Sequence, residues 1–461
     1  MRIKNRDQLL SRGNRRAREV ALDLIEHALK AVNPYEAAKK LVHIENERRL
    51  VISNLSYDLS RVADLYVVGA GKATFPIAQA LDEILGDRIK RGAINVKSGE
   101  KRRLKHITVR ESGHPMPNGI GFEGAKEIVD IAKEAKEGDL VFACITGGAS
   151  ALMPFPAKGI SLEDKRKVTD LLLRSGAAID EINTVRKHIS AIKGGRLAMY
   201  IHPAEAINLM VIDEVAGLPW GPTVSDTTTF QDAAHVLRKH NLWRRIPVSV
   251  KKHLERGITD PRLETPKPRD FQSVKVHNVV LANNELACEA AKKRAEEYGF
   301  DSMILSTVLE GESREAGIVL AGIAKEVEEK SRPLRPPCVL IAGGETTVTI
   351  KEQSGMGGPS QELALGFALK IAGSENILIA ALDTDGTDGP SDIAGGIADG
   401  YTKKRAKEEG IDIYKNLLHH NSSFVLRELE DAIITGQTGT NVMDLNVIVI
   451  SADRDNDLLE E

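Results

Sequence analysis

The chain has 461 residues, of which 42% are hydrophobic and 28% charged, and its formal net charge at pH 7 is −3. This length is too great for one ordinary hydrophobic core, so at least two domains are expected. The balanced charge gives no overall attraction to nucleic acid or to an anionic membrane. No apolar run reaches the roughly 18 residues of a membrane span, and the first residues lack the apolar core of a signal peptide. With three widely spaced cysteines, the chain is predicted to be cytoplasmic, with no nucleic-acid or membrane partner.

The first 50 residues are predicted to be helical, because apolar side chains recur every three to four positions between Leu9 and Leu29. From Asp64 onward, apolar strands, glycine-containing turns and amphipathic helices alternate, which is typical of an α/β fold with a parallel sheet covered on both faces. The segment 256–275 contains three prolines and few apolar residues, so it is predicted to be a linker. The predicted organisation in chain order is N-terminal helices packing on the domains over 1–50, a first α/β domain over 51–255, the linker over 256–275, and a second α/β domain over 276–461.

Four predicted strands end in glycine or charged residues that a plain connection does not need. Glycines there allow backbone amides to approach a phosphate or carboxylate closely, and a following helix N-terminus favours an anion. Tight turns alone explain many glycine pairs, but four such loops in both halves of the chain indicate a ligand cleft between two domains. Three of the loops supply the candidate phosphate- or substrate-binding residues Gly69, Gly71, Gly147, Gly148, Ser150, Gly343, Gly344 and Glu345.

Lys72 follows the first of these glycine turns, yet the turn matches neither common nucleotide-binding motif. Tyr66 stands where the first glycine of a P-loop belongs, and Ala73 replaces its Ser or Thr. Thr74 replaces the third glycine of a dinucleotide fingerprint, and the next strand ends in Lys97 rather than in the acid that holds an NAD ribose. Lys72 is a candidate for offsetting charge on a transferring phosphoryl group or a substrate carboxylate. An ordinary surface lysine is the alternative.

The fourth loop follows a predicted apolar strand and is strongly acidic. It contains Asp383, Asp385, Asp388 and Asp392 among turn-forming residues. So many carboxylates repel one another unless a cation or a proton is shared, and Mg²⁺ is the most plausible hard cation with oxygen ligands. The spacing does not match an EF-hand, because Ala394 stands where the bidentate Glu belongs. A metal or phosphate site is one interpretation of this loop, and a solvated Asp/Gly turn is the other.

A basic helical face is predicted within residues 182–198. Arg186, Ser190 and Lys193 are spaced i, i+4 and i+7, so they would share one side of a helix. That side is a candidate for holding a small anion, although such a pattern taken alone is more often a solvated basic surface.

Eight motifs occur in a fixed order along the chain: VVGAGKA, ESGHPMPN, TGGASALM, NTVRKHISAIKGGRLA, GGETTVTI, QELALGFAL, ALDTDGTDGP and TGTNVMDL. Together they resemble the class II glycerate kinases, also called the glycerate 2-kinase or MOFRL family. The resemblance implies transfer of the γ-phosphoryl group of ATP to the 2-hydroxyl of D-glycerate, giving 2-phosphoglycerate, with Mg²⁺ or another divalent cation. It also implies two three-layer α/β/α domains, the first Rossmann-like with a parallel sheet and the second with a mixed sheet, with the active site in the interdomain cleft. A homodimer is left open.

The resemblance also suggests roles for the candidate residues. Lys72 matches the family's catalytically important lysine in the GAGKA motif. We hypothesise that the acidic loop binds the metal through Asp383, Asp385 and Asp388 or orients the hydroxyl, and that one of its aspartates accepts the hydroxyl proton. Arg186 and Lys193 would hold the glycerate carboxylate.

One stretch departs from the family pattern. Where many relatives have Gly-Gly-Arg-Asn-Gln-Glu, this chain has Gly-Gly-Pro-Ser-Gln-Glu at 357–362. Any contact made by that arginine is therefore missing, and Arg186 or Lys193 is a candidate substitute.

Two other functions are weighed against the kinase. Some family members are labelled hydroxypyruvate reductases, but the damaged dinucleotide fingerprint and Lys97 disfavour NAD. Hydride transfer would also give the acidic loop no task. A non-catalytic sensor of a small anion is also conceivable, yet such a sensor gains nothing from four carboxylates beside its ligand.

Overall fold

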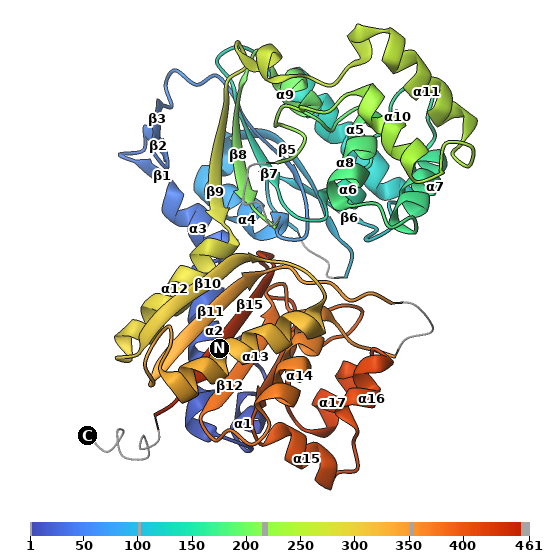
Figure 1. Cartoon of the computed structure of the whole chain (residues 1–461). Coiled ribbons are helices and arrows are strands. Elements are labelled where there is room, and N and C mark those ends of the chain that lie inside the picture. The colour runs from blue at the N-terminus through green and yellow to red at the C-terminus, as the bar shows by residue number, and fades with distance from the viewer. Residues whose placement is uncertain (1, 100–102, 214–219, 351–354, 453–461) are drawn as a thin grey trace. The chain divides into compact units, whose positions relative to one another are not determined.

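The computed structural model describes residues 2–99, 103–213, 220–350 and 355–452 (Figure 1). The chain divides into two compact units: unit 1 comprises Met1–Asn33, Ile212–Gly217 and Ala282–Glu461, and unit 2 comprises Pro34–Val211 and Leu218–Leu281. Each unit is built around a six-stranded sheet with helices packed against it. The predicted α/β class, with one parallel and one mixed sheet, is confirmed.

The large sheet of unit 2 has the strand order β6-β5-β4-β7-β8-β9. Neighbouring strands from β6 to β8 pair in parallel, so their carboxyl ends lie along one edge. The strands are β4 Leu65–Ala70, β5 Ile89–Lys97, β6 Thr108–Ser112, β7 Leu140–Ile145, β8 Glu205–Val211 and β9 Val276–Ala282. A small antiparallel sheet precedes them, formed by β1 Val42–Glu45, β2 Arg49–Ile52 and β3 Leu55–Asp58.

The described residues of unit 2 include two hydrophobic clusters that position the candidate site. The first lies on the sheet, where Val68 and Ala143 of the strands pack with Ile128 of a helix. The second is a helical core in which Val168, Val185 and Phe230 are fully buried or nearly so. The helices are α3 Pro34–Leu41, α4 Thr74–Leu85, α5 Gly119–Glu134, α6 Ala149–Leu152, α7 Leu162–Leu173, α8 Ile179–His188, α9 Arg196–Ile201, α10 Phe230–Lys239 and α11 Val248–Thr259, with short 3₁₀ turns at Gly86–Arg88, Pro261–Leu263 and Pro268–Phe271.

The sheet of unit 1 has the order β10-β11-β15-β12-β13-β14 and is mixed. The last strand of the chain, β15, lies in its interior and runs antiparallel to both of its neighbours, β11 and β12. The strands are β10 Asp301–Leu309, β11 Cys338–Gly344, β12 Ile377–Asp383, β13 Gly395–Asp399, β14 Ala432–Ile433 and β15 Asp444–Ile450. The helices are α1 Arg6–Leu9, α2 Arg15–Ala31, α12 Asn284–Glu297, α13 Ser313–Lys330, α14 Pro359–Ile371, α15 Thr402–Glu408, α16 Ile413–Leu418 and α17 Ser422–Glu428.

The N-terminal helices α1 and α2 belong to unit 1. Arg18 of α2 is fully buried, and its guanidinium lies 2.8 Å from a carboxylate oxygen of Asp399 and 2.8 Å from one of Asp431. Removing one partner of such a buried cluster would leave an uncompensated charge, which typically costs about 3–5 kcal/mol. Helix α3 instead belongs to unit 2, so the expected N-terminal segment 1–50 is divided between the two units at Asn33.

The proline-containing segment 256–275 lies within unit 2 rather than at a boundary between the units. Thr265 in this segment is buried, and Glu264 accepts a hydrogen bond from the backbone of Phe230 at 3.2 Å. These contacts explain why a segment with few apolar residues is nevertheless packed. No helix among the described residues is both long and apolar enough to span a membrane.

Candidate active site

In unit 2, the loops that follow β4 and β7 lie against each other at the carboxyl edge of the sheet. The Lys72 amide donates to the Gly147 carbonyl at 2.7 Å, and the Ala73 amide donates to the Thr146 hydroxyl at 3.1 Å. A Cβ on Gly148, whose φ is +83°, would lie 3.1 Å from the His114 ring and 3.3 Å from Cγ of Lys72. The predicted loops containing Lys72 and Gly148 are therefore brought together.

Packing between strands already accounts for several of the glycines in these loops. Gly71 has a φ of +149°, and a Cβ there would lie 1.9 Å from the Thr146 hydroxyl. A Cβ on Gly69, Gly343 or Gly344 would likewise come within 2.4 Å of a neighbouring element. Glycine is required at these positions whether or not an anion binds, so their predicted binding roles stay predictions.

The basic residues predicted on one helix are brought close to these loops by a different local structure. The predicted helix over 182–198 is wrong: α8 ends at His188 and α9 begins at Arg196. Gly194 and Gly195 have φ angles of +60° and +83°, which a right-handed helix cannot accommodate. Lys193 instead reaches the loop after β7, where its ammonium donates to the Ser150 hydroxyl at 2.5 Å.

Arg186 of α8 is partly buried, and burial lowers the pKa of its guanidinium. Within the part of the chain that the structure describes, it has no carboxylate partner. A guanidinium presents five N–H donors suited to a carboxylate or a phosphate, so this side chain is available to an anionic ligand.

In unit 1, the carboxyl ends of β11 and β12 meet the beginning of β15. The β12–β15 register sets Asp383 opposite Asp444, and the β11–β15 register sets Asp444 opposite Gly344. Glu345 follows β11 directly and is exposed. Three predicted residues, Asp383, Gly344 and Glu345, therefore lie along one edge together with Asp444, which sequence reasoning missed.

These carboxylates raise one another's proton affinity. Burial raises the pKa of Asp383, and the charges of Asp385, Asp444 and Asp388 raise it further. Burial likewise raises the pKa of Asp444, with contributions from Asp388 and Glu345. The edge is thus unfavourable for several negative charges at once and would be stabilised by a bound cation.

The two other predicted metal ligands, Asp385 and Asp388, differ in the hydrogen bonds that their carboxylate oxygens already accept. One Asp385 oxygen accepts from the amide and hydroxyl of Thr387 at 2.9 and 2.7 Å. Asp388 is buried and accepts from the backbone amides of Ser360 and Gln361 at 3.2 and 2.9 Å, at the start of α14. Burial raises the pKa of Asp388 to about 7. Asp388 therefore acts as a cap for α14 in this structure, whereas Asp383 and Asp444 have fewer protein partners.

The same edge is compatible with Mg²⁺ although it is not a complete protein cage. No three His, Cys, Asp or Glu side chains in the described ranges are arranged to hold a metal ion by themselves. Mg²⁺ in phosphoryl-transfer sites is usually bound by one or two carboxylates together with substrate phosphates and water. Asp383 and Asp444, with Asp385 beside them, are sufficient for that mode of binding.

Comparison with known proteins identifies the family. Residues 20–255 match the model described as a domain of unknown function (DUF4147), and residues 338–444 match the MOFRL family. A glycerate 2-kinase of Pyrococcus horikoshii is 43% identical over 442 residues, which cover 95% of this chain and 98% of the relative. The chain belongs to the MOFRL glycerate kinase family.

Two further relatives also match most of the chain. The crystal structure of a glycerate kinase from Thermotoga maritima superimposes with a TM-score of 0.81 at 36% identity, covering 94% of this chain and 99% of that one. A protein of Agrobacterium vitis described as a putative hydroxypyruvate reductase is 36% identical over 389 residues, covering 83% of this chain and 98% of the relative.

The departure from the family pattern at 357–362 lies at the start of α14. Pro359 occupies the first turn of the helix, where its missing N–H costs nothing. Ser360 is buried, and its amide is one of the two that Asp388 caps. In this chain the position is therefore built to begin a helix and contributes no cationic side chain.

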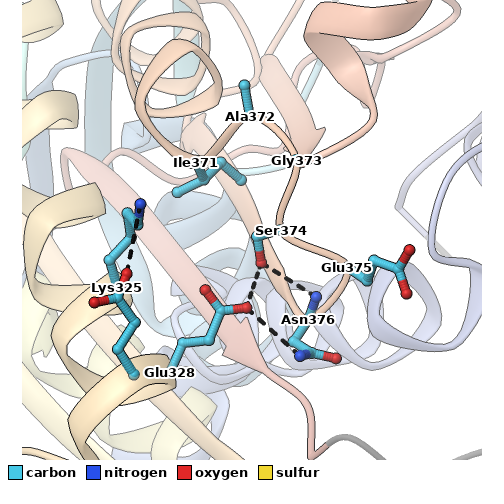
Figure 2. A pocket seen from close by; sticks show the side chains of 9 residues that line it. Lys325, Glu328, Ile371, Ala372, Gly373, Ser374, Glu375 and Asn376 are labelled. Atoms are coloured by element: carbon cyan, nitrogen blue, oxygen red, sulfur yellow. Dashed lines mark hydrogen bonds and ion pairs between the residues drawn. The ribbon is translucent and has the colours of Figure 1, made fainter.

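A shallow hollow of about 510 Å³ also exists in unit 1, but it does not contain the candidate residues (Figure 2). It is lined by α13 and by the turn between α14 and β12, including Glu328, Ser374 and Asn376. The Ser374 hydroxyl donates to Glu328 at 2.6 Å. The hollow lies before β12 begins, whereas Asp383 stands at the other end of that strand.

Proposed function

We propose that this chain transfers the γ-phosphoryl group of ATP to the 2-hydroxyl of D-glycerate, giving 2-phosphoglycerate and ADP. The observation that carries the proposal is the 43% identity, over nearly the whole of both chains, to a protein named glycerate 2-kinase. The two charged sheet edges support it, because phosphoryl transfer depends mainly on positioning and on neutralising charge.

The reaction requires a proton acceptor for the glycerate hydroxyl. As the hydroxyl oxygen forms its bond to the γ-phosphorus, the bond from that phosphorus to the β–γ bridging oxygen breaks and ADP departs. The hydroxyl proton passes to an aspartate of the acidic loop, for which Asp383 and Asp385 are the candidates. A divalent cation, when bound by Asp383 with Asp385 and Asp444, supplies charge neutralisation to the phosphates.

The cationic residues of unit 2 take the complementary roles. Lys72, beside Gly148, would offset the negative charge that develops on the transferred group. Arg186 and Lys193 would hold the glycerate carboxylate, and the fork of Arg186 suits bidentate binding. Asp388, already engaged by α14, is the weakest candidate among the metal ligands.

The reductase activity named for the Agrobacterium vitis relative is the second candidate, but local structure disfavours it. The third glycine of a dinucleotide fingerprint is replaced by Thr74, whose buried hydroxyl donates to the Cys144 carbonyl at 3.1 Å. Lys97, at the end of β5, is exposed and cannot accept a hydrogen bond from a ribose. The small-anion sensor has no observation that favours it.

A coupled assay with ATP, Mg²⁺ and D-glycerate tests the proposal. The product is passed to enolase alone and, in parallel, to enolase with phosphoglycerate mutase. Signal with enolase alone identifies 2-phosphoglycerate and is the expected result. Signal only with the mutase would mean 3-phosphoglycerate and reverse the regiochemistry. Turnover in neither, with oxidation of NADH or NADPH by hydroxypyruvate, would replace the kinase by the reductase.

A further inference from the structure

Lys165 is a buried lysine without an anionic partner. It lies on the face of α7 that also carries Val168 and Leu172, both part of the helical core. Only 3% of Lys165 is exposed, and its ammonium nitrogen has no hydrogen-bond partner among the described residues. Lysine is almost never fully buried unless it is paired, so this position calls for an explanation beyond packing.

The chain brings Lys165 close to two cations of the candidate site. The turn before α7 is joined to the end of α8, since the Ala157 amide donates to the Ile189 carbonyl at 3.1 Å. Val168 of α7 and Val185 of α8 belong to the same buried cluster, and the charges of Arg186 and Lys193 act on the Lys165 amine. Lys193 lies in the bend between α8 and α9, and its amide donates to the Ser190 hydroxyl at 3.4 Å.

Two acids in this part of unit 2, Asp226 and Glu264, are already engaged with other cations. Asp226 is paired with Lys187 and lies 4.0 Å from His188. Glu264 is 3.0 Å from His188 and 3.3 Å from the ammonium of Lys267. Lys165 therefore lies near Arg186 and Lys193, and neither Lys165 nor Arg186 has a carboxylate partner among the described side chains.

The electrostatic consequence is large. Burial, followed by the charges of Lys193, Arg186 and Arg196, holds the pKa of the Lys165 amine well below its usual value. Burial and the neighbouring cations therefore disfavour the charged form of this amine in the free protein. An anion placed among these groups would favour the charged ammonium and supply the missing hydrogen-bond acceptor.

We infer that Lys165 completes, with Arg186 and Lys193, a binding site for a small oxyanion. The inference deepens the proposed function, on which its choice of ligand rests: the oxyanion is the carboxylate of the acid substrate. The phosphates of the nucleotide have the same chemistry, and the test separates the two sources.

The test compares Lys165→Met with Lys167→Met, an exposed lysine on the same helix. Calorimetry measures the affinity of each variant for D-glycerate and, separately, for ATP with MgCl₂, and thermal melting measures Tm without ligand. Lys165→Met is expected to weaken D-glycerate binding by about 10-fold or more, as loss of a charge-assisted hydrogen bond implies. Its ATP affinity should not change, and its Tm should rise because a buried unpaired amine is replaced by an apolar side chain. Lys167→Met should match the wild type in all three.

The other outcomes are also decisive. Loss of ATP affinity with unchanged D-glycerate affinity would support the oxyanion site and assign it to phosphate. Unchanged affinity for both ligands would overturn the inference. If Lys165→Met does not fold, Arg186→Met at its partly exposed position takes its place: weaker binding at a normal Tm supports the site, and unchanged binding rejects it.

The two proposals can fail separately. If the wild type binds D-glycerate through Lys165 but makes no phosphoglycerate in the coupled assay, the proposed function fails and the site stands. If phosphoglycerate is made and Lys165→Met binds both ligands like the wild type, the function stands and the site fails.

Discussion

The two units present opposite charges at comparable places. Both candidate regions lie beyond the ends of strands or in the bends beside them. In unit 2 the cations Lys165, Arg186 and Lys193 lie near one another, and the ammonium of Lys165 has no hydrogen-bond partner among the described residues. In unit 1 Asp383 and Asp444 lie opposite each other on neighbouring strands. Burial and the neighbouring carboxylates raise the pKa of both side chains, so a proton or a cation is favoured there.

On the proposed function, the two kinds of charge suit different ligands. Like charges held together under burial destabilise the free protein, and a ligand of opposite charge removes that cost. An acid substrate suits the cationic cluster, and nucleotide phosphates with their metal suit the acidic edge. The comparison therefore predicts that variants in either cluster lose ligand binding or catalysis while keeping or gaining stability.

The largest expected effect is on Asp383. Asp383→Asn should lower kcat by roughly 10³-fold, since it removes both a metal ligand and a candidate proton acceptor. The Tm of the ligand-free protein should stay equal or rise, because one of several repelling charges is lost. The coupled assay and thermal melting measure the two effects.

The matched control is Asp392→Asn. Asp392 belongs to the same loop, but its side chain is 77% exposed and pairs with Arg427, so kcat should be unaffected. If the Asp383→Asn variant keeps full kcat/KM, Asp383 has no role in the mechanism. Equal losses of kcat in both variants would indicate a general disruption of the loop.

Lys72 is expected to give the next largest effect. Lys72→Met should reduce kcat by about 10²-fold, with a smaller change in KM, because the lysine acts on charge that develops during transfer. Lys97→Met, an exposed lysine at the end of the neighbouring strand β5, is the control and should behave like the wild type. A rise in KM with unchanged kcat would instead assign Lys72 to substrate binding.

Much of this arrangement follows from local sequence patterns. The strand before Asp383 and the loop containing Lys72 are both where periodicity and glycine placement indicate. Asp444 could not be found in this way. It becomes a partner of Asp383 only because β15, the last strand of the chain, pairs antiparallel between β11 and β12, and long-range strand order is not encoded in any local pattern.

The sequence did not single out Lys165, for a different reason. A lysine near the start of an amphipathic helix is ordinarily solvated, although its spacing of three and seven from Val168 and Leu172 places it on the apolar face. The break between α8 and α9 was also missed, even though Gly194 and Gly195 mark it. The attachment of the N-terminal helices to unit 1 depends on Arg18 and two acids that lie 381 and 413 residues away, which sequence alone does not connect.

A third prediction concerns metal binding at Asp444. Mg²⁺ with ATP should raise the Tm of the wild type, and a tenfold weaker metal site in Asp444→Asn would lose about 1.4 kcal/mol of that stabilisation. Asp301→Asn is the control, since Asp301 is exposed and begins β10, at the opposite end of the strands from Asp444. An Asp444→Asn variant that gains as much Tm from Mg²⁺ and ATP as the wild type would exclude Asp444 from the metal site.

The smallest expected effect is a pH dependence of stability that belongs to Lys165. In the folded protein burial and neighbouring cations lower the pKa of its amine, whereas the unfolded chain keeps the ordinary value of 10.5. Between the lowered pKa and 10.5 the unfolded state binds more protons, so the free energy of unfolding rises with pH, by at most about 1.4 kcal/mol per pH unit. Lys165→Met lacks this contribution and should be more stable than the wild type at pH 7, with the difference shrinking towards pH 10. Denaturant unfolding of both proteins at pH 7, 8 and 9 measures it, with Lys167→Met as the control. A difference that does not change with pH would mean that the Lys165 amine stays charged in the folded protein, and the cationic cluster of unit 2 would then need a permanent acidic partner.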